Sequence, residues 1–101
     1  MAEFVSAAKV SEIPPGNGKS VEINGTPIAI FNVNGTFYAI NDTCAHAGGP
    51  LGEGFLEDTI VTCPWHGWKY DVTSGQSTVV PSAKVDSFQV KVEGDEIKVA
   101  V

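Results

Sequence analysis

The sequence contains no arginine, and its basic side chains are few. Six lysines stand against twelve aspartates and glutamates in 101 residues, which gives a formal net charge of −6 at pH 7. Because nucleic-acid binding depends on clustered lysine and arginine side chains that neutralise phosphates, this balance argues against a nucleic-acid partner. An acidic surface instead keeps a protein in solution, or steers it toward a basic docking patch on another protein.

Long apolar runs and helical periodicity are also absent. No segment reaches the run of about eighteen apolar residues that indicates a membrane-spanning helix. Residues 1–10 include Glu3 and Lys9 and lack the apolar stretch of a signal peptide. The chain has the length of one small domain with a modest core. We therefore expect a single-domain, cytoplasmic protein, a monomer that has no membrane partner.

Apolar and β-branched residues alternate with polar ones over much of the chain, as in β-strands. Asn24-Gly25 and Asn34-Gly35 each separate two such segments, and this pair is the strongest short-range signal for a β-hairpin. Residues 88–93 and 97–101 predict a C-terminal hairpin with one core face and one solvent face. The other strands that we expect are 4–7, 19–23, 27–33 and 36–40. The fold class is therefore all-β, a small sandwich or barrel, with one long irregular insertion between strands.

Cysteine and histidine are scarce, and their positions are informative. Both cysteines and both histidines fall in two short motifs, Cys44-Ala45-His46 and Cys63-Pro64-Trp65-His66, which are separated by sixteen residues. Thiolate and imidazole groups are the donors that zinc ions and some iron–sulfur clusters take in proteins. A metal centre is therefore the leading hypothesis for this part of the chain.

Three interpretations of these four residues compete. A disulfide between Cys44 and Cys63 would leave both histidines unexplained and does not suit a reducing compartment. A structural Cys₂His₂ zinc site is chemically possible, but zinc fingers pair cysteine with cysteine and histidine with histidine along the chain. In a [2Fe–2S] cluster with two histidines on one iron, one cysteine and one histidine from each motif would hold both metals. The mixed pairing favours the cluster.

The complete pattern, Cys44-x-His46 followed by Cys63-x-x-His66, resembles the signature of Rieske proteins. The resemblance continues after the second motif, through Trp68 and Tyr70-Asp71 to Ser74-Gly75. It implies one [2Fe–2S] cluster per chain, in which Cys44 and Cys63 bind the inner iron. His46 and His66 would then bind the outer iron.

The same resemblance implies the Rieske fold, in which three antiparallel sheets carry a cluster-binding lobe of loops. A single Rieske domain would span residues 1–101, with the lobe at about residues 42–83 and a base formed by the remainder. Within the lobe, residues 48–51 would shape the first cluster loop. Residues 79–82 would form the third, proline-bearing loop over the cluster, or else an ordinary connection.

Differences from the respiratory members of the family point to a ferredoxin. Those members have two further cysteines in a disulfide and a membrane anchor, whereas this sequence has no third cysteine and shows no such segment. They also place a serine where this chain has Trp68, and loss of a hydrogen bond to a cluster sulfur lowers the reduction potential. Tyr70 matches a hydrogen-bonding tyrosine of those members. We expect a potential in the lower half of the Rieske range of about −150 to +300 mV.

With both histidines used as ligands, no second iron site of the two-histidine, one-carboxylate type remains. We therefore expect an electron carrier and not an enzyme. It would pass single electrons from a flavoprotein ferredoxin reductase to a terminal Rieske oxygenase of the aromatic-ring dioxygenase type. The small Rieske subunit of an assimilatory nitrite reductase is the alternative, and a zinc-stabilised structural interaction module is a third.

Several residues near the motifs have two interpretations. Trp65 would line the docking surface or shield the cluster from water, or else only pack the loop. Trp68 and Phe55 are expected in the core of the lobe. The acidic residues between the motifs, which would form either a docking rim or an ordinary solvated surface, are Glu53, Glu57 and Asp58.

Overall fold

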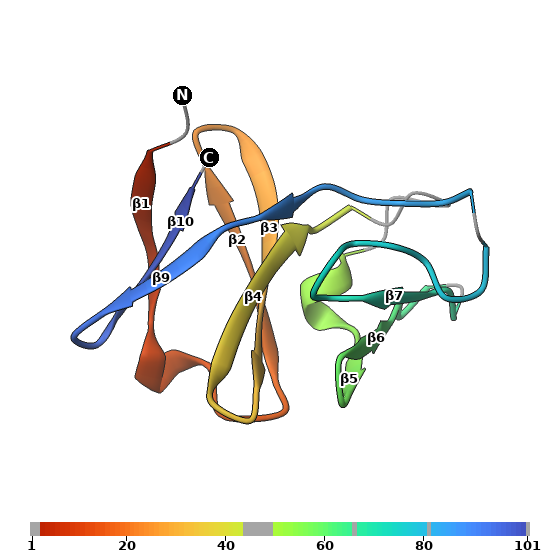
Figure 1. The fold of residues 1–101 in the computed structure, drawn as a ribbon, viewed down its shortest axis with the longest axis horizontal. Coiled ribbons are helices and arrows are strands. Elements are labelled where there is room, and N and C mark those ends of the chain that lie inside the picture. Colours follow the sequence, from red (N-terminus) through yellow and green to blue (C-terminus); the bar gives the residue numbers. More distant parts are fainter. Residues whose placement is uncertain (1–2, 44–49, 66, 81, 101) are drawn as a thin grey trace.

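Ten β-strands form three antiparallel sheets in the computed structural model, which describes residues 3–43, 50–65, 67–80 and 82–100 (Figure 1). The strands of the first sheet, in spatial order, are β1 (Phe4–Lys9), β10 (Glu96–Ala100) and β9 (Val90–Glu93). The strands of the second sheet are β2 (Gly18–Ile23), β3 (Thr26–Val33), β4 (Thr36–Asn41) and β8 (Ser87–Phe88). The strands of the third sheet are β5 (Phe55–Glu57), β6 (Ile60–Thr62) and β7 (Lys69–Asp71). Among the described residues, the only helical elements are two 3₁₀ turns, η1 (Val10–Glu12) and η2 (Leu51–Glu53). The predictions of an all-β fold and of three antiparallel sheets are confirmed.

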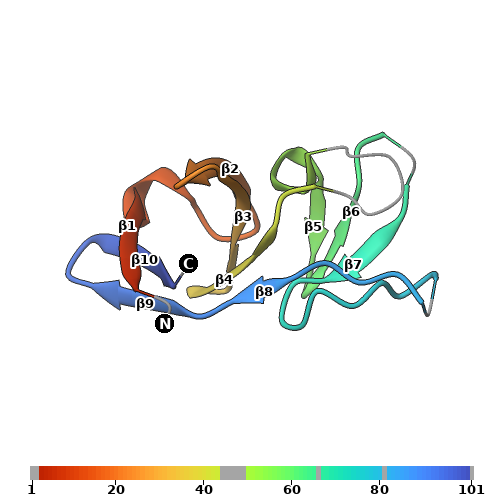
Figure 2. The same ribbon diagram turned by 90° about the horizontal axis from the view of Figure 1, so that it is seen from above.

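The sheets lie in a row, with the second sheet in the middle and the third at one end (Figures 1 and 2). We call the first two sheets the base. The third sheet lies between β4 and β8 along the chain, within the predicted lobe of residues 42–83. The prediction that this insertion is irregular was wrong, since it contains three short strands. Each is only three residues long, too short for an alternation pattern to show in the sequence.

The two Asn-Gly pairs form the turns that the sequence predicted. Asn24 and Gly25 have φ angles of 50° and 82°, and Asn34 and Gly35 have φ angles of 51° and 93°. Positive φ at both central residues is what a type I′ hairpin turn requires. These turns join β2 to β3 and β3 to β4 in register, so the middle sheet follows directly from local sequence.

β3 is buried on both faces and contributes to both hydrophobic cores that the described residues form. Ile28 and Ile30 belong to the core between the two base sheets, together with Ile97 of β10. Ala29 and Phe31 face the other way, into a second core that the base shares with the lobe. The buried residues of this second core, the lobe core, are Ala29, Phe31, Ile40, Leu51, Val61, Cys63, Tyr70, Val72 and Val85. β4 does the same, with Ile40 in the lobe core and Ala39 in the other core, so both strands join base and lobe.

The C-terminal hairpin differs from the prediction in one respect. Ile97 and Val99 are buried as expected, but residues 88–93 do not form one strand. Phe88 pairs with β4, whereas β9 pairs with β10, so the chain changes sheet at Gln89. Val92 was expected on the core face and is 46% exposed, because β9 is the edge strand of its sheet. Val101 lies outside the described residues.

None of the helical turns in the described part of the chain has the length and apolar composition needed to span a bilayer.

Candidate metal centre

Cys63, the first residue after β6, is the predicted ligand that the structure describes. Its side chain is 2% exposed, and the cysteine is free. Cys44, the other half of the disulfide alternative, lies outside the described residues, so the structure does not test that alternative. Cys63 belongs to the lobe core, whose other members include Val61, Tyr70 and Phe31. A thiol in this position is held by packing from base and lobe together.

The turn that follows Cys63 is closed by backbone hydrogen bonds. The Cys63 amide donates to the carbonyl of Trp68 over 2.7 Å, and the Gly67 amide donates to the carbonyl of Cys63 over 3.1 Å. Gly67 has a φ of 74°, a conformation that glycine adopts without steric cost. The chain therefore reverses direction between Cys63 and Trp68.

The other three predicted ligands, Cys44, His46 and His66, lie outside the described residues. In the part of the chain that the structure describes, no three cysteine, histidine or acidic side chains are grouped as a metal site would require. That part includes one of the four predicted ligands. The loop that carries Cys44 and His46 is bounded by described residues, and Thr43 and Pro50 pair with each other at its base.

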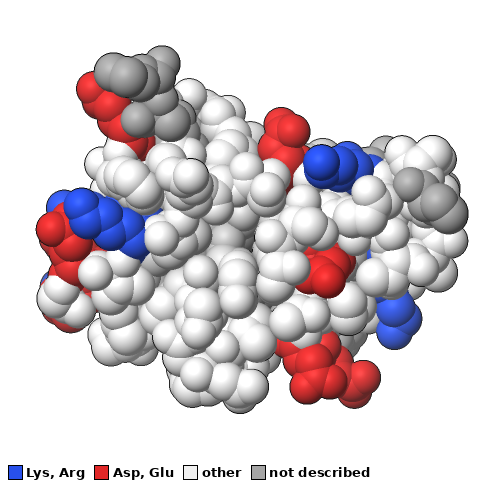
Figure 3. Space-filling model, viewed as in Figure 1, with Lys and Arg blue, Asp and Glu red and all other residues white. Residues whose placement is uncertain are grey.

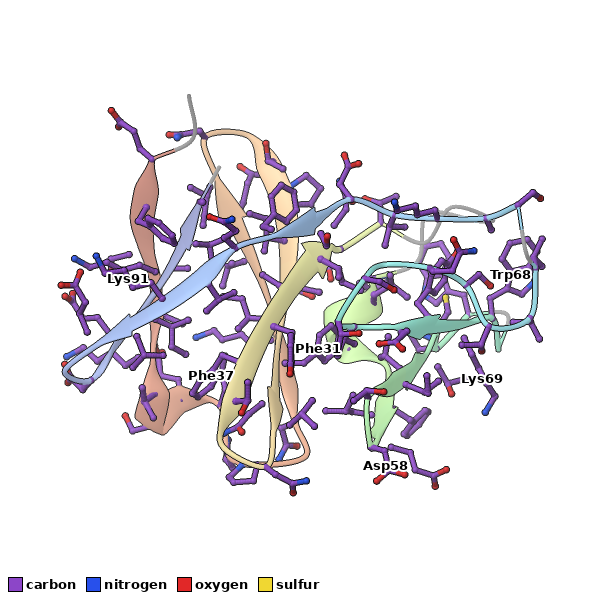
Figure 4. All side chains as sticks on the ribbon, viewed as in Figure 1. Phe31, Phe37, Asp58, Trp68, Lys69 and Lys91 are labelled. Carbon is purple, nitrogen blue, oxygen red and sulfur yellow. The ribbon has the colours of Figure 1, made fainter. Side chains whose placement is uncertain are left out.

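The aromatic residues of the lobe are arranged partly as predicted. Trp68 is half-buried against the lobe core at the far end of the lobe (Figure 4). Tyr70 is completely buried in that core, and a hydrogen bond from its hydroxyl to the cluster stays a prediction. Trp65 is 60% exposed. The prediction that Phe55 belongs to the lobe core was wrong, since its side chain is 74% exposed on the edge strand β5.

The predicted third loop is the end of a long excursion between β7 and β8. The Ser77 amide donates to the carbonyl of Ala83 over 3.0 Å, so the two arms of the excursion are joined. The hydroxyl of the buried Ser77 accepts hydrogen bonds from the amides of Val79 and Val80, over 3.2 and 3.1 Å. Pro81 lies outside the described residues. The described part of this loop is therefore a turn held by the hydrogen bonds of Ser77.

On the face drawn in Figure 3, charged side chains lie at the base end of the molecule and are scattered from its middle over the lobe, and an uncharged area lies between these two groups. In the base, the pKa of Glu93 is lowered, first by a hydrogen bond from Lys98 and then by the charge of Lys91. In the lobe, Glu53, Glu57 and Asp58 are exposed. Asp58 lies at the end of the β5–β6 hairpin (Figure 4).

One residue that the sequence interpretation passed over stands beside the first motif. Asp42 is 9% exposed, and its carboxylate accepts hydrogen bonds from Ser20 and Gly52. An aspartate after a strand has many structural uses, and its partners lie 22 and 10 positions away along the chain. No local pattern in the sequence could have indicated this role.

The comparison with family models supplies the deciding observation. Residues 3–98 match the model of the Rieske [2Fe-2S] domain, which is nearly the whole chain. The chain belongs to the Rieske family. Membership in this family implies a [2Fe–2S] cluster. The donor set fits it: two cysteines and two histidines are available in the sequence, and the described cysteine is a free thiol in a closed turn.

Relatives of this Rieske domain include ferredoxins of oxygenase systems. The ferredoxin component of biphenyl 2,3-dioxygenase from Rhodococcus jostii (strain RHA1) is 39% identical over 89 residues, which cover 87% of this chain and 83% of that protein. The ferredoxin component of the naphthalene 1,2-dioxygenase/salicylate 5-hydroxylase systems of a Ralstonia species is 34% identical over 91 residues, 89% of this chain and 88% of the relative.

Solved structures show the same fold. A complex of reduced oxygenase and oxidised ferredoxin in carbazole 1,9a-dioxygenase contains a chain with a TM-score of 0.87 and 31% identity, covering 96% of this chain and 92% of that one. A structure described as an NADH-dependent nitrite reductase small subunit from Mycobacterium tuberculosis has a TM-score of 0.92 at 20% identity, covering 100% of this chain and 96% of that one. At such low identity this second likeness concerns the fold alone.

Proposed function

We propose that this Rieske domain is the ferredoxin component of an aromatic-ring dioxygenase system. It holds one [2Fe–2S] cluster through Cys44, His46, Cys63 and His66. It carries single electrons from a flavoprotein ferredoxin reductase to a terminal Rieske oxygenase, and it is not itself an enzyme. The observation that carries the proposal is the free, buried thiol of Cys63 in the closed turn 63–68 of a Rieske domain. The relatives named as ferredoxin components support the choice of system.

Each part of the lobe has a task in this proposal. A bound Rieske cluster supplies a one-electron redox couple. Cys63 and Cys44 contribute thiolates, and the burial of Cys63 keeps water from its sulfur. The half-buried Trp68 and the buried Tyr70 exclude solvent on the side of the lobe core. The exposed Trp65, directly before His66, offers a partner an apolar contact beside an iron ligand.

The alternative, a nitrite reductase small subunit, has the same fold and is supported only at that level. The nitrite reductase likeness is 20% identical, whereas the dioxygenase ferredoxins reach 34% and 39%. The presence of all four ligand residues in the sequence also favours an electron carrier over a structural module. The dioxygenase system is therefore the better-supported function.

The first prediction concerns the metal itself. Anaerobically purified protein is expected to contain two iron atoms and two sulfides per chain, as a single [2Fe–2S] cluster requires. On reduction with dithionite it should give an electron paramagnetic resonance (EPR) spectrum with nitrogen couplings from histidine ligands. Iron and sulfide analysis together with pulsed EPR provides the measurement. A colourless protein that contains one zinc ion would contradict the proposal.

A second prediction concerns Trp65. Replacing it with alanine is expected to slow electron transfer to a terminal oxygenase by about tenfold, because exposed tryptophans that become buried in an interface often contribute more than about 1 kcal/mol to binding. The measurement is the second-order rate at which the reduced ferredoxin reduces an oxygenase that the wild-type protein also reduces.

Val92→Ala is the matched control for Trp65, since Val92 is 46% exposed on the first sheet of the base, far along the chain from both motifs. This variant should keep the wild-type rate. The reduction potential of both variants should equal that of the wild type, so that a slower rate reports docking. Equal rates for Trp65→Ala and the wild type would assign Trp65 to loop packing.

A further inference from the structure

The carboxylate of Asp42 joins three segments of the chain at the base of the first ligand loop. Its Oδ1 atom accepts a hydrogen bond from the hydroxyl of Ser20 on β2, over 2.9 Å. The same oxygen accepts a hydrogen bond from the amide of Gly52 in η2, over 2.7 Å. Asp42 is 9% exposed. Hydrogen bonds to a charged acceptor in such a sheltered place are roughly twice as strong as those between neutral groups.

The backbone around Asp42 reinforces the same junction. The Asp42 amide donates to the carbonyl of Pro27 over 3.0 Å, and the Leu51 amide donates to the carbonyl of Asp42 over 2.7 Å. Thr43 and Pro50 form an antiparallel bridge directly inside this closure. The two ends of residues 43–50 are therefore fixed to each other and to the base.

Gly52 shows how closely the parts of this junction fit. A Cβ atom at position 52 would collide with the hydroxyl of Ser20 and would lie 2.7 Å from the amide nitrogen of Ser20. Glycine is therefore needed for η2 to approach β2, and that approach places the Gly52 amide against Asp42. The hydrogen bond from Gly52 to the Asp42 carboxylate and the close approach of Gly52 to Ser20 therefore depend on each other.

We propose that Asp42 is a positioning residue that clasps the first ligand loop and so presets Cys44 and His46 for the cluster. This inference rests on the proposed function, which makes these two residues ligands. Cys44 is two positions from Asp42 along the chain, and the chain returns to the Asp42 carboxylate at Gly52. Fixing the loop ends removes much of the chain entropy that cluster binding would otherwise have to overcome. Asp42 acts through the loop, without contributing a ligand.

Asn32 provides a matched comparison in the base. It is 4% exposed, its Nδ2 donates to the carbonyl of Ile13 over 2.8 Å, and its Oδ1 accepts from the amide of Gly35 over 2.7 Å. Asn32 thus also makes two side-chain hydrogen bonds, one to a segment 19 positions away and one to the adjacent β3–β4 turn. It contacts neither of the ligand motifs through these bonds. Asn32→Ala therefore measures what the loss of such a buried junction does to the fold alone.

The experiment compares holo-protein carrying Asp42→Ala, Asp42→Asn, Ser20→Ala or Asn32→Ala. The loss of visible absorbance in excess iron chelator measures how fast each variant loses its cluster. Each variant is measured at a temperature that lies the same number of degrees below its own melting temperature. We expect Asp42→Ala to lose the cluster about tenfold faster than the wild type, as for other residues that orient metal ligands. Its EPR lines should broaden because the ligand loop samples more geometries. Asp42→Asn keeps the Oδ1 acceptor and should restore most of the retention.

Each outcome distinguishes the possibilities. Asn32→Ala should melt at a lower temperature while keeping wild-type EPR lines and retention; equally fast loss in this variant would reduce Asp42 to a general stabilising role and overturn the inference. Wild-type retention and line widths in Asp42→Ala would overturn it as well. If Asp42→Ala does not fold, Ser20→Ala decides, since it removes one of the two hydrogen bonds and should show a smaller change in the same direction. A wild-type protein without a [2Fe–2S] cluster would instead refute the proposed function.

Discussion

Replacing Cys63 with alanine is expected to abolish the [2Fe–2S] cluster, its colour and its EPR signal, and with them all electron transfer. The reason is chemical, because a Rieske iron bound only by sulfur takes two cysteine thiolates and the chain contains no third cysteine to substitute. The fold itself should survive. Cys63 is a small, buried side chain, and a single removed sulfur leaves a modest cavity in a core of nine buried residues.

The measurement combines iron and sulfide analysis, EPR after dithionite reduction and far-ultraviolet circular dichroism. Val61→Ala is the control, because Val61 is buried in the same core two positions earlier and has no donor atom. It should lose about 1–2 kcal/mol of stability from two buried carbon groups and still hold the cluster. Full cluster content in Cys63→Ala would show that Cys63 is not a ligand.

The sequence predicted the parts of the fold that local chemistry determines. Asn-Gly pairs require the type I′ geometry, so the β2–β3–β4 meander could be predicted with its turns. The apolar, β-branched residues 27–33 predicted a strand, and the structure confirms β3 and adds that it has a core on each face. The ligand hypothesis for Cys63 likewise depended on residue types and spacing, which a sequence displays directly.

The wrong predictions concern residues whose burial or sheet membership is determined by tertiary contacts. Alternation predicts that Val92 is a strand residue, but neither this pattern nor the apolar character of Phe55 shows whether anything covers the side chain. The change of sheet at Gln89 depends on where β4 and β10 lie, and no property of Gln89 itself reveals it. The clasp at Asp42 needs Ser20 and Gly52 to come together in space, so a single sequence could not assign it.

Replacing Phe31 with alanine is expected to cost about 3–5 kcal/mol of unfolding free energy and to separate the lobe from the base. Phe31 is completely buried between the two parts (Figure 4). Its ring covers Gly18 on the paired strand, where a Cβ atom would lie 2.6 Å from two ring carbons. The same ring belongs to the core that contains Cys63. Its removal therefore weakens the packing under the cluster as well as the sheet.

Anaerobic urea unfolding of the holo-protein tests this coupling, with visible absorbance reporting on the lobe and far-ultraviolet circular dichroism on the base. In the wild type the two signals should change together, as in a single cooperative transition. In Phe31→Ala the absorbance should be lost at a lower urea concentration than the dichroism. Phe37→Ala is the matched control, because Phe37 is 9% exposed and belongs to the core between the base sheets. In Phe37→Ala the absorbance and the dichroism should shift together, because the lobe packs on β3 of the base and is lost when the base unfolds. If the two signals instead separate in Phe37→Ala and coincide in Phe31→Ala, base and lobe are not coupled through Phe31.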